Sequence, residues 1–281
     1  MKAAEIFELE AVQFAEPSFS ALTEPAYNTM LAGCEADEGR FLLDEHEDPL
    51  AIAFRTPDGW VACSFLCRAP SVALIEKFES VNGEIFQEDR AVWAAAVREY
   101  FSMQLAEEVP PALEDLNPVR EKIIADVITR AWGKGAGETC IDCGCGSGVG
   151  SLVLRSLGYT PLSYDNDASL LSRGLSAQRL RPAETMCLDA TAASAYIDPV
   201  PRGIGIMMGE INAFSSDMWH AIVTELLRVS NETLITVGTE PEARLVKQWG
   251  EECDRAVEIQ ESPGDAFYDH WVCLVHTAAK E

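Results

Sequence analysis

The stretch Asp142-Cys143-Gly144-Cys145-Gly146-Ser147-Gly148 decides the fold class of this chain. It ends a short apolar run at residues 139–143, which is typical of a buried β-strand, and it leads into residues 148–157, whose spacing predicts a helix. Glycine at alternate positions lets the backbone turn tightly and approach a ligand without a Cβ in the way. A helix N-terminus behind such a loop favours polar or anionic ligand groups. The stretch therefore predicts a strand–loop–helix unit that binds a ligand.

Two phosphate-binding motifs do not fit this stretch. The dinucleotide fingerprint G-x-G-x-x-G/A would place its third small residue at Val149 when counted from Gly144, and at Ser151 when counted from Gly146. A P-loop would need Gly-Lys followed by Ser or Thr, and the loop has no lysine. A nucleotide-dependent oxidoreductase is therefore the less favoured interpretation.

Strand-like and helix-like segments alternate on the C-terminal side of this loop. Strands are predicted at 139–143, 162–164, 185–188, 204–208 and 234–237, and helices at 148–157, 168–180, 217–229 and 242–252. This alternation is typical of a parallel sheet covered on both faces. The last two strands, 256–261 and 271–276, are separated by a loop too short for a helical crossover, so they are expected to pair antiparallel. The fold class predicted is α/β, with a doubly wound, mostly parallel seven-stranded sheet that ends in an antiparallel hairpin.

The N-terminal part follows a different pattern and is predicted to be a smaller α+β segment. Residues 1–49 read as irregular and acidic, and Pro57-Asp58-Gly59 separates two strand-like runs, as in a hairpin. A long amphipathic helix at 88–107 is ended by Pro110 and Pro111. We therefore expect two domains, 1–115 and 116–281, with a helix at the start of the second that Asn117 caps.

The composition restricts the function classes. The 281 residues include 21 Lys and Arg against 46 Asp and Glu, a formal net charge of −25, which disfavours binding to phosphate backbones. The nine cysteines are an odd number without a disulfide framework, which favours reduced thiols in a cytoplasmic protein. Residues 1–17 are acidic, unlike a secretory signal, and the sequence has no apolar run long enough for a transmembrane helix.

In the glycine loop, the acids at the strand ends and the terminal strand pair, residues 116–281 resemble class I S-adenosylmethionine-dependent methyltransferases. In that family an acid stands two residues before G-x-G-x-G, as Asp142 does here. The family places a ribose-binding acid at the end of the second strand, where this chain has Asp165, and holds adenine at the end of the third, where it has Asp189-Ala190. The antiparallel terminal pair is also a family feature. Residues 1–115 resemble no family that we can name.

The resemblance implies S-adenosyl-L-methionine as the methyl donor and assigns roles to individual residues. A carboxylate at Asp165 can accept hydrogen bonds from both ribose hydroxyls, because it has two acceptor oxygens. Glu210, which follows the predicted fourth strand, is the candidate catalytic base by position. The cofactor-binding residues implied are Asp142, Gly144, Cys145, Gly146, Gly148, Asp165, Asn166, Asp189, Ala190 and Gly209.

Two nearby features are interpreted as structural. Asp167 also follows the second strand, but it is interpreted as a helix cap and not as a ribose ligand. Cys140, Cys143 and Cys145 are interpreted as packing residues, so no metal site is predicted.

The function predicted is in-line methyl transfer to a small molecule or a protein side chain. The sequence Met208-Gly209-Glu210-Ile211 replaces the Asn-Pro-Pro-Tyr motif of enzymes that methylate adenine or amide nitrogens, and nucleic acid is an unlikely partner. The alternative is a non-catalytic S-adenosylmethionine-binding protein with a regulatory or assembly role. Residues 1–115 are expected to select the substrate or cover the site, with Phe41, Phe54, Trp60 and Phe65 forming either a lid or a small core of this segment. The sequence does not predict the oligomeric state.

Overall fold

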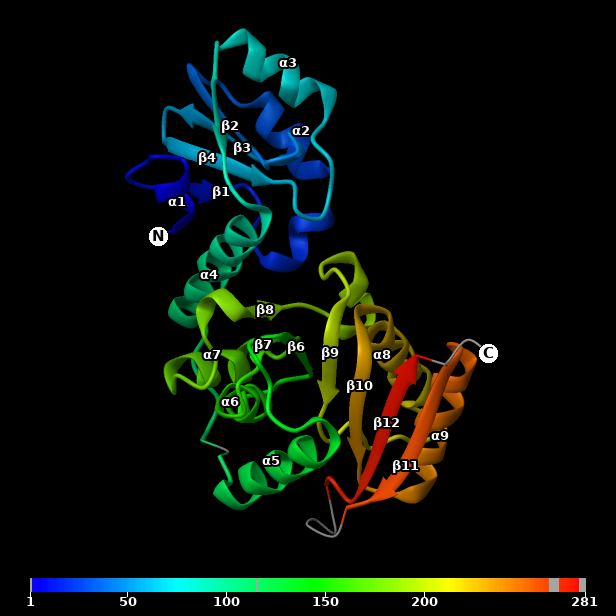
Figure 1. Cartoon of the computed structure of the whole chain (residues 1–281). Helices are drawn as coiled ribbons and strands as arrows, with labels where there is room; N and C mark the ends of the chain where they lie inside the picture. The colour runs from blue at the N-terminus through cyan, green and yellow to red at the C-terminus, as the bar shows by residue number, and fades with distance from the viewer. Residues whose placement is uncertain (1, 115, 263–267, 278–281) are drawn as a thin grey trace. The chain divides into compact units, whose positions relative to one another are not determined.

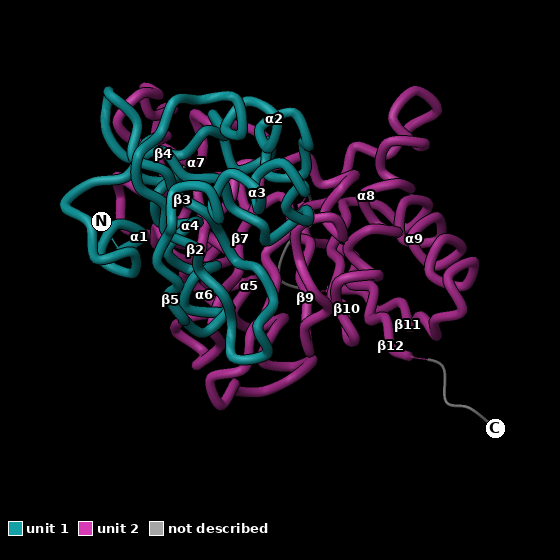
Figure 2. The backbone as a smooth tube through the Cα atoms, turned by 90° about the horizontal axis from the view of Figure 1, so that it is seen from above, with its two compact units in different colours: residues 1–104 teal, residues 105–281 magenta. Residues whose placement is uncertain are grey.

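The computed structural model describes residues 2–114, 116–262 and 268–277, which form two compact units, Met1–Gln104 and Leu105–Glu281 (Figures 1 and 2). In the described residues, no helix combines the length and the hydrophobicity that crossing a membrane requires.

Unit 1 is built around a five-stranded sheet with the strand order β1-β4-β3-β2-β5 (Figure 1). Its elements are α1 Lys2–Ile6, β1 Gln13–Phe14, η1 Phe19–Thr23, α2 Ala26–Gly33, β2 Glu38–Leu43, β3 Pro49–Thr56, β4 Gly59–Ser64, α3 Val72–Ser80, β5 Glu84–Gln87 and α4 Arg90–Glu108, whose last turn belongs to unit 2. The predicted hairpin is confirmed as β3 and β4, which pair antiparallel around the turn at residues 57–58.

The prediction that residues 1–49 are irregular is wrong. This segment contributes α1, β1, η1, α2 and β2. Strand β1 pairs parallel with β4, and β2 pairs parallel with β5, which the sequence analysis also missed. Both pairings join segments that are far apart in the chain, so the local pattern of β1 and β5 carries too little signal to reveal them.

The aromatic residues proposed for a lid contribute largely to the core of unit 1. Phe54 and Phe65 are buried in one cluster with Leu31 and Ile52, and Phe41 packs against this cluster. Trp60 lies under the guanidinium of Arg40, 5.2 Å from its ring centre. The structure therefore favours the second expectation for Phe54 and Phe65, that they form a core of this segment.

The compact units divide inside helix α4, between Gln104 and Leu105, whereas the sequence pattern predicts the boundary between residues 115 and 116. Leu105 packs against the cluster of Cys145, Leu171 and Leu180 in unit 2, so the last turn of α4 belongs to that unit.

Unit 2 contains the predicted seven-stranded sheet, with the order β11-β12-β10-β9-β6-β7-β8. Strands β6 to β10 run parallel, while β12 pairs antiparallel with both β10 and β11. The elements are α5 Pro118–Trp132, β6 Thr139–Cys143, α6 Val149–Ser156, β7 Thr160–Asp165, α7 Ala168–Ser176, η2 Pro182–Glu184, β8 Thr185–Cys187, η3 Ala190–Ala195, β9 Val200–Gly205, α8 Ser216–Val229, β10 Ser230–Val237, α9 Glu240–Glu252, β11 Arg255–Glu261 and β12 Trp271–Thr277.

Helices cover both faces of this sheet (Figure 1). Ile204 of β9 packs in one cluster with residues of α5 and α6. Its neighbours Gly203 and Gly205 face Leu226 of α8 on the opposite side. The fold class predicted from the sequence is therefore confirmed, a doubly wound sheet with an antiparallel C-terminal hairpin.

Strand β9 lies earlier than the predicted 204–208, because it ends at Gly205. The apolar run continues through Met208, but the chain turns back there, and Met207 has a φ of 59°. The Met208 side chain occupies the space beside Gly205, where a Cβ would lie 2.0 Å from its sulfur. Apolar character alone did not distinguish the strand from the turn that covers its end.

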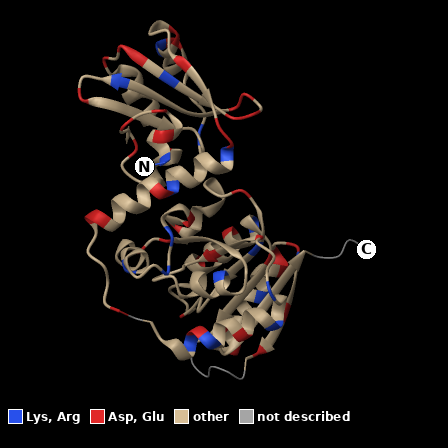
Figure 3. Cartoon of the chain, turned by 60° about the vertical axis from the view of Figure 1, so that its left-hand side comes forward, with Lys and Arg blue, Asp and Glu red and all other residues tan. Residues whose placement is uncertain are grey.

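Charged residues are spread over both units (Figure 3). Several arginines of unit 2 are held in ion pairs, among them Arg120 with Asp269, Arg179 with Glu114, and Arg202 with Glu138. Their positive charge is therefore largely compensated locally.

A buried ion pair between Glu16 and Arg68 joins the segments of unit 1. The side chains are 0% and 5% exposed. The guanidinium of Arg68 also donates to Asn28 Oδ1 at 2.8 Å and to the Leu22 carbonyl at 2.7 Å, and Glu16 Oε1 accepts from the Ser64 N–H. Burial raises the pKa of Glu16, with the charge of Arg68 acting in the opposite direction.

Replacing Arg68 by alanine should destabilise the protein by roughly 3–5 kcal/mol, because it leaves the buried Glu16 carboxylate unpaired. Arg55→Ala is the matched control, since Arg55 pairs with Asp37 and Glu38 on the exposed surface of the same unit and should change stability little. Denaturant unfolding of both variants measures the difference. Equal losses in the two variants would contradict the role assigned to the buried pair.

Candidate functional site

The glycine loop between β6 and α6 turns back sharply at the carboxyl end of β6. Gly144, Gly146 and Gly148 have φ values of 63°, 51° and 87°, in the left-handed region that favours glycine. At Gly148 glycine is also needed for space, because a Cβ there would lie 2.7 Å from the Leu180 side chain. The loop thus places the first turn of α6 directly behind the end of the strand.

Asp142 anchors this turn from inside the protein. It is 2% exposed, and its Oδ2 accepts the Ser151 hydroxyl of α6 at 2.6 Å. Gly150 leaves room for the carboxylate, since a Cβ there would lie 2.7 Å from Asp142 Oδ1. Burial raises the pKa of Asp142 to about 6, although the hydrogen bonds from Ser151 act to lower it. The side chain therefore faces α6.

Asp165 links the glycine loop to the neighbouring strand β7. Its Oδ2 accepts the Gly146 N–H and its Oδ1 accepts the Asp167 N–H, both at 2.8 Å. Asp167 caps α7 by accepting the N–H groups of Ser169 and Leu170, as predicted. The Asp165 carboxylate is therefore held in one orientation by the backbone on both sides.

Asp189 follows β8 and caps the short helix η3. Its Oδ1 accepts both the N–H and the hydroxyl of Thr191 at 2.8 Å. Its second oxygen accepts no hydrogen bond from the described residues. Asp165 and Asp189 thus stand at the ends of two adjacent parallel strands, each with acceptor capacity remaining.

These strand ends surround a cavity of about 330 Å³. One side carries the two acids, and the other is an apolar wall that comes from the end of β9 and from α8. The lining residues are Cys143, Gly144, Asp165, Asn166, Asp189, Ala190, Thr191, Ile206, Met207, Met208, Met218, Trp219 and Ile222. Ligand pockets typically measure about 300–1,000 Å³, so a nucleoside-sized ligand fits.

The cavity brings together five of the residues predicted to bind a cofactor, namely Gly144, Asp165, Asn166, Asp189 and Ala190. The other five do not line it. Asp142, Gly146 and Gly148 shape the loop, and the Cys145 side chain is buried against Leu171 and Leu180. Gly209 lies beside the buried Glu242, whose Oε1 accepts the Ile211 N–H at 2.8 Å.

The candidate base Glu210 is exposed and does not line the cavity either. Its carbonyl accepts the hydroxyl of Ser215 at 2.7 Å. The sequence pattern does not reveal the apolar wall of α8, because Met218, Trp219 and Ile222 follow a helical spacing that equally suits a core-facing stripe.

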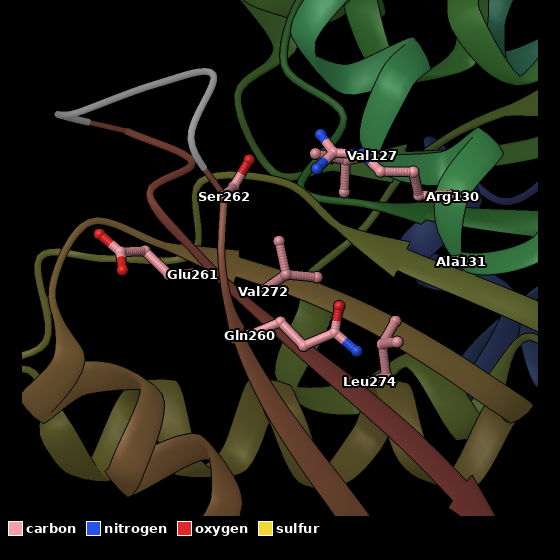
Figure 4. A pocket seen from close by; sticks show the side chains of 8 residues that line it. All are labelled: Val127, Arg130, Ala131, Gln260, Glu261, Ser262, Val272 and Leu274. Atoms are coloured by element: carbon pink, nitrogen blue, oxygen red, sulfur yellow. The ribbon is translucent and has the colours of Figure 1, made fainter.

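A second cavity, of about 100 Å³, lies between α5 and the terminal hairpin (Figure 4). Val127, Val272 and Leu274 give it an aliphatic lining, and Gln260 and Glu261 stand at its side. It is too small for a nucleoside and contains none of the acids at the ends of the parallel strands. The larger cavity is therefore the candidate site.

The thiols near the glycine loop are buried. Burial raises the pKa of Cys143 to about 12, and it raises the pKa of Cys140 and Cys145 well above the usual value. Within the described residues, no three His, Cys, Asp or Glu side chains are grouped so that they could hold a metal ion.

Neither the family models nor the curated proteins contain a match to this sequence. Many solved structures match part of this chain in fold. The magnesium protoporphyrin IX methyltransferase of Synechocystis PCC 6803, solved with bound S-adenosylmethionine, is 13% identical, with 65% of this chain and 96% of that chain covered and a TM-score of 0.47. A ribosomal protein methylase of Lactobacillus delbrueckii subsp. bulgaricus is 16% identical, with 59% and 82% covered and a TM-score of 0.44.

A precorrin 8w decarboxylase from Methanobacterium thermoautotrophicum also matches, at 15% identity, with 62% and 98% covered and a TM-score of 0.43. All three scores are below 0.5, so the likeness is loose and concerns the fold alone. The fold class itself, a doubly wound sheet with an antiparallel terminal hairpin, rests on the strand order and on strand β12.

The buried Asp142 should give stability a specific pH dependence. Its pKa of about 6 in the folded protein lies above the ordinary 3.8, so the folded state holds this proton more tightly than the unfolded state. The stabilisation is present below pH 4 and is lost as pH rises through 6, a change of about 3 kcal/mol.

The measurement is the free energy of unfolding of the wild type minus that of Asp142→Asn, from pH 4 to pH 7. This difference should fall as pH rises, because the amide of the variant does not titrate. The contributions of all other acidic groups are the same in both proteins and cancel in the difference. A difference that stays flat over this range would show that Asp142 titrates normally.

Proposed function

We propose that this protein is an S-adenosyl-L-methionine-dependent methyltransferase. The observation that carries the proposal is the cavity that joins Gly144 of the glycine loop to Asp165 and Asp189 at the ends of two adjacent strands. This arrangement offers acceptors for the hydroxyl groups of a ribose and for the amine of an adenine, beside a wall of methionine and tryptophan side chains. The family resemblance of the sequence assigns the same three positions to this donor.

The residues of the cavity fit the adenosyl part of the donor. Each Asp165 oxygen accepts one backbone N–H, and a carboxylate has about four lone-pair sites, so both oxygens can accept a further hydrogen bond from the vicinal hydroxyls. The second oxygen of Asp189 would accept from the adenine amine, and the Ala190 N–H would meet a ring nitrogen. Ile206, Met207 and Trp219 would cover the faces of the ring.

Asp142, Gly146 and Gly148 would act on the donor indirectly, by fixing the loop. The bound donor supplies a sulfonium methyl group that is already activated for displacement, and the chain has to align it with an acceptor atom in line with the breaking bond. A thiol acceptor needs little assistance at neutral pH, whereas an amine or hydroxyl needs a base. Because Glu210 lies outside the cavity lining, we propose it as a base only for an acceptor bound at the exposed rim.

The acceptor is proposed to be a small molecule or a protein side chain. The net charge of −25 and the ion-paired arginines of unit 2 disfavour a phosphate backbone. Residues 1–115 are proposed to contribute to acceptor choice, since unit 2 contains the complete sheet and the cavity without them.

One observation favours the alternative of a non-catalytic donor-binding protein. The titratable groups among the described lining residues are Asp165, Asp189 and Cys143. Both acids hold backbone groups, and the raised pKa of Cys143, about 12, keeps its thiol neutral. The cavity itself therefore supplies no obvious base. Transfer of a labelled methyl group to any acceptor would exclude this alternative.

The donor site is tested by titration with S-adenosylhomocysteine in a calorimeter. We expect a Kd in the micromolar range, about −8 kcal/mol. Asp165→Ala should weaken binding by about 1.5–3 kcal/mol, because it removes hydrogen bonds to a charged acceptor.

Asp167→Ala is the matched control, since Asp167 is the neighbouring acid, caps α7 and does not line the cavity. It should leave the affinity nearly unchanged. Unaltered affinity in a folded Asp165→Ala protein, or tight binding of NAD(H) in place of S-adenosylhomocysteine, would refute the assignment.

A further inference from the structure

Met207 has an unusual backbone conformation at a functional position. Its φ of 59° is left-handed, although it is not a glycine, and it lines the cavity with 40% of its surface exposed. Such a conformation is unfavourable for a residue with a Cβ and persists only where its surroundings impose it. The contacts that hold Met207 in this conformation therefore help to shape the cavity.

Thr236, near the end of β10, holds this turn. Regular pairing between β9 and β10 ends at Gly205 and Ile235. Beyond that point the Met207 N–H donates to the Thr236 hydroxyl oxygen at 2.7 Å, and the Met208 N–H donates to the Thr236 carbonyl at 2.8 Å. One residue of β10 thus receives two successive N–H groups and turns the chain back over the strand end.

The Thr236 hydroxyl is itself oriented by the buried carboxylate of Asp269, which forms an ion pair with the half-buried Arg120. It donates its single hydrogen to Asp269 Oδ1 at 2.6 Å, so its oxygen is left to accept from Met207. Asp269 is 0% exposed, and its Oδ2 accepts from Nε of Arg120, in the first turn of α5, at 3.1 Å. The chain of contacts runs from Arg120 through Asp269 and Thr236 to Met207.

None of Arg120, Asp269 and Thr236 lines the cavity, whereas Met207 and Met208, which Thr236 holds, both do. We propose that these three residues are positioning residues for the donor, holding Met207 in the left-handed conformation that completes the apolar wall against the adenine. This inference rests on the proposed function. It makes donor affinity depend on the ion pair between Arg120 of α5 and the buried Asp269 before β12.

The test is calorimetric titration of the full-length protein with S-adenosylhomocysteine. Thr236→Val keeps the shape of the side chain but removes the hydroxyl, and should weaken binding at least tenfold. Thr236→Ser restores the hydroxyl and should bind within about threefold of the wild type.

Thr233→Val is the matched control. Thr233 lies on the same strand, is equally buried, and shares a 2.8 Å hydrogen bond with the Ser230 hydroxyl. Its replacement removes one buried hydrogen bond and should change affinity less than threefold, so the loss of a buried hydrogen bond on β10 is separated from positioning. Equal affinity of the folded Thr236→Val protein and the wild type would overturn the positioning role.

A second comparison at Met207 is independent of how well Thr236→Val folds. Alanine tolerates a left-handed backbone better than the β-branched valine does, although valine offers more apolar surface to the ligand. Met207→Val should therefore bind more weakly than Met207→Ala, and the opposite order would overturn the inference. A wild-type protein that does not bind S-adenosylhomocysteine at all would instead overturn the proposed function on which the inference rests.

Discussion

The site depends on one constraint, which is that the chain must reverse within a few residues at the end of β6 and still begin a helix behind the strand. Left-handed glycines make this reversal possible, and Gly148 is additionally required because Leu180 occupies the space of a Cβ. The buried Asp142 fastens the first turn of α6 by accepting the Ser151 hydroxyl. Removing the left-handed glycines or the hydrogen bond between Asp142 and Ser151 would move the backbone that forms one side of the cavity.

The second acid of the loop region serves structure and site together. Asp165 accepts N–H groups from the glycine loop and from the turn before α7, so the same carboxylate that faces the cavity also ties two strand ends together. A carboxylate held in this way needs little reorganisation to receive a ligand. Asp189 likewise caps a helix with one oxygen, while its other oxygen accepts no hydrogen bond from the part of the chain that the structure describes.

The two edges of the sheet are stabilised differently. At the amino ends of the parallel strands, Arg202 lies against the rings of Trp132 and Tyr159, 5.2 and 5.3 Å from their centres, and pairs with Glu138 and Glu232. The carboxyl ends have no comparable cluster among the residues that line the cavity, and the polar groups there are arranged around open space. The cavity therefore lies at the carboxyl ends of the parallel strands, which is the usual position of ligand sites in open α/β sheets.

The sequence by itself determined the class of the fold, and half of the positions that it predicts to bind a cofactor line the cavity. Strand and helix periodicity, the alternate glycines and the short final loop are local features, so they predicted the order of the elements and the antiparallel end of the sheet. The acids Asp165 and Asp189 could be placed because Asp165 ends β7 and Asp189 comes just after β8, and the ends of adjacent parallel strands share one edge.

Only the tertiary structure decided which side chains reach the cavity. Asp142 and Cys145 belong to the same motif as Gly144, yet they point into the protein, because side chains alternate along a strand and the loop twists after it. Three other features join residues that are far apart in the chain. They are the apolar wall of α8, the pairings of β1 and β5 in unit 1, and the contacts that link Arg120 to Met207. No local pattern encodes such contacts, since they arise only when the packed strands and helices bring those residues together.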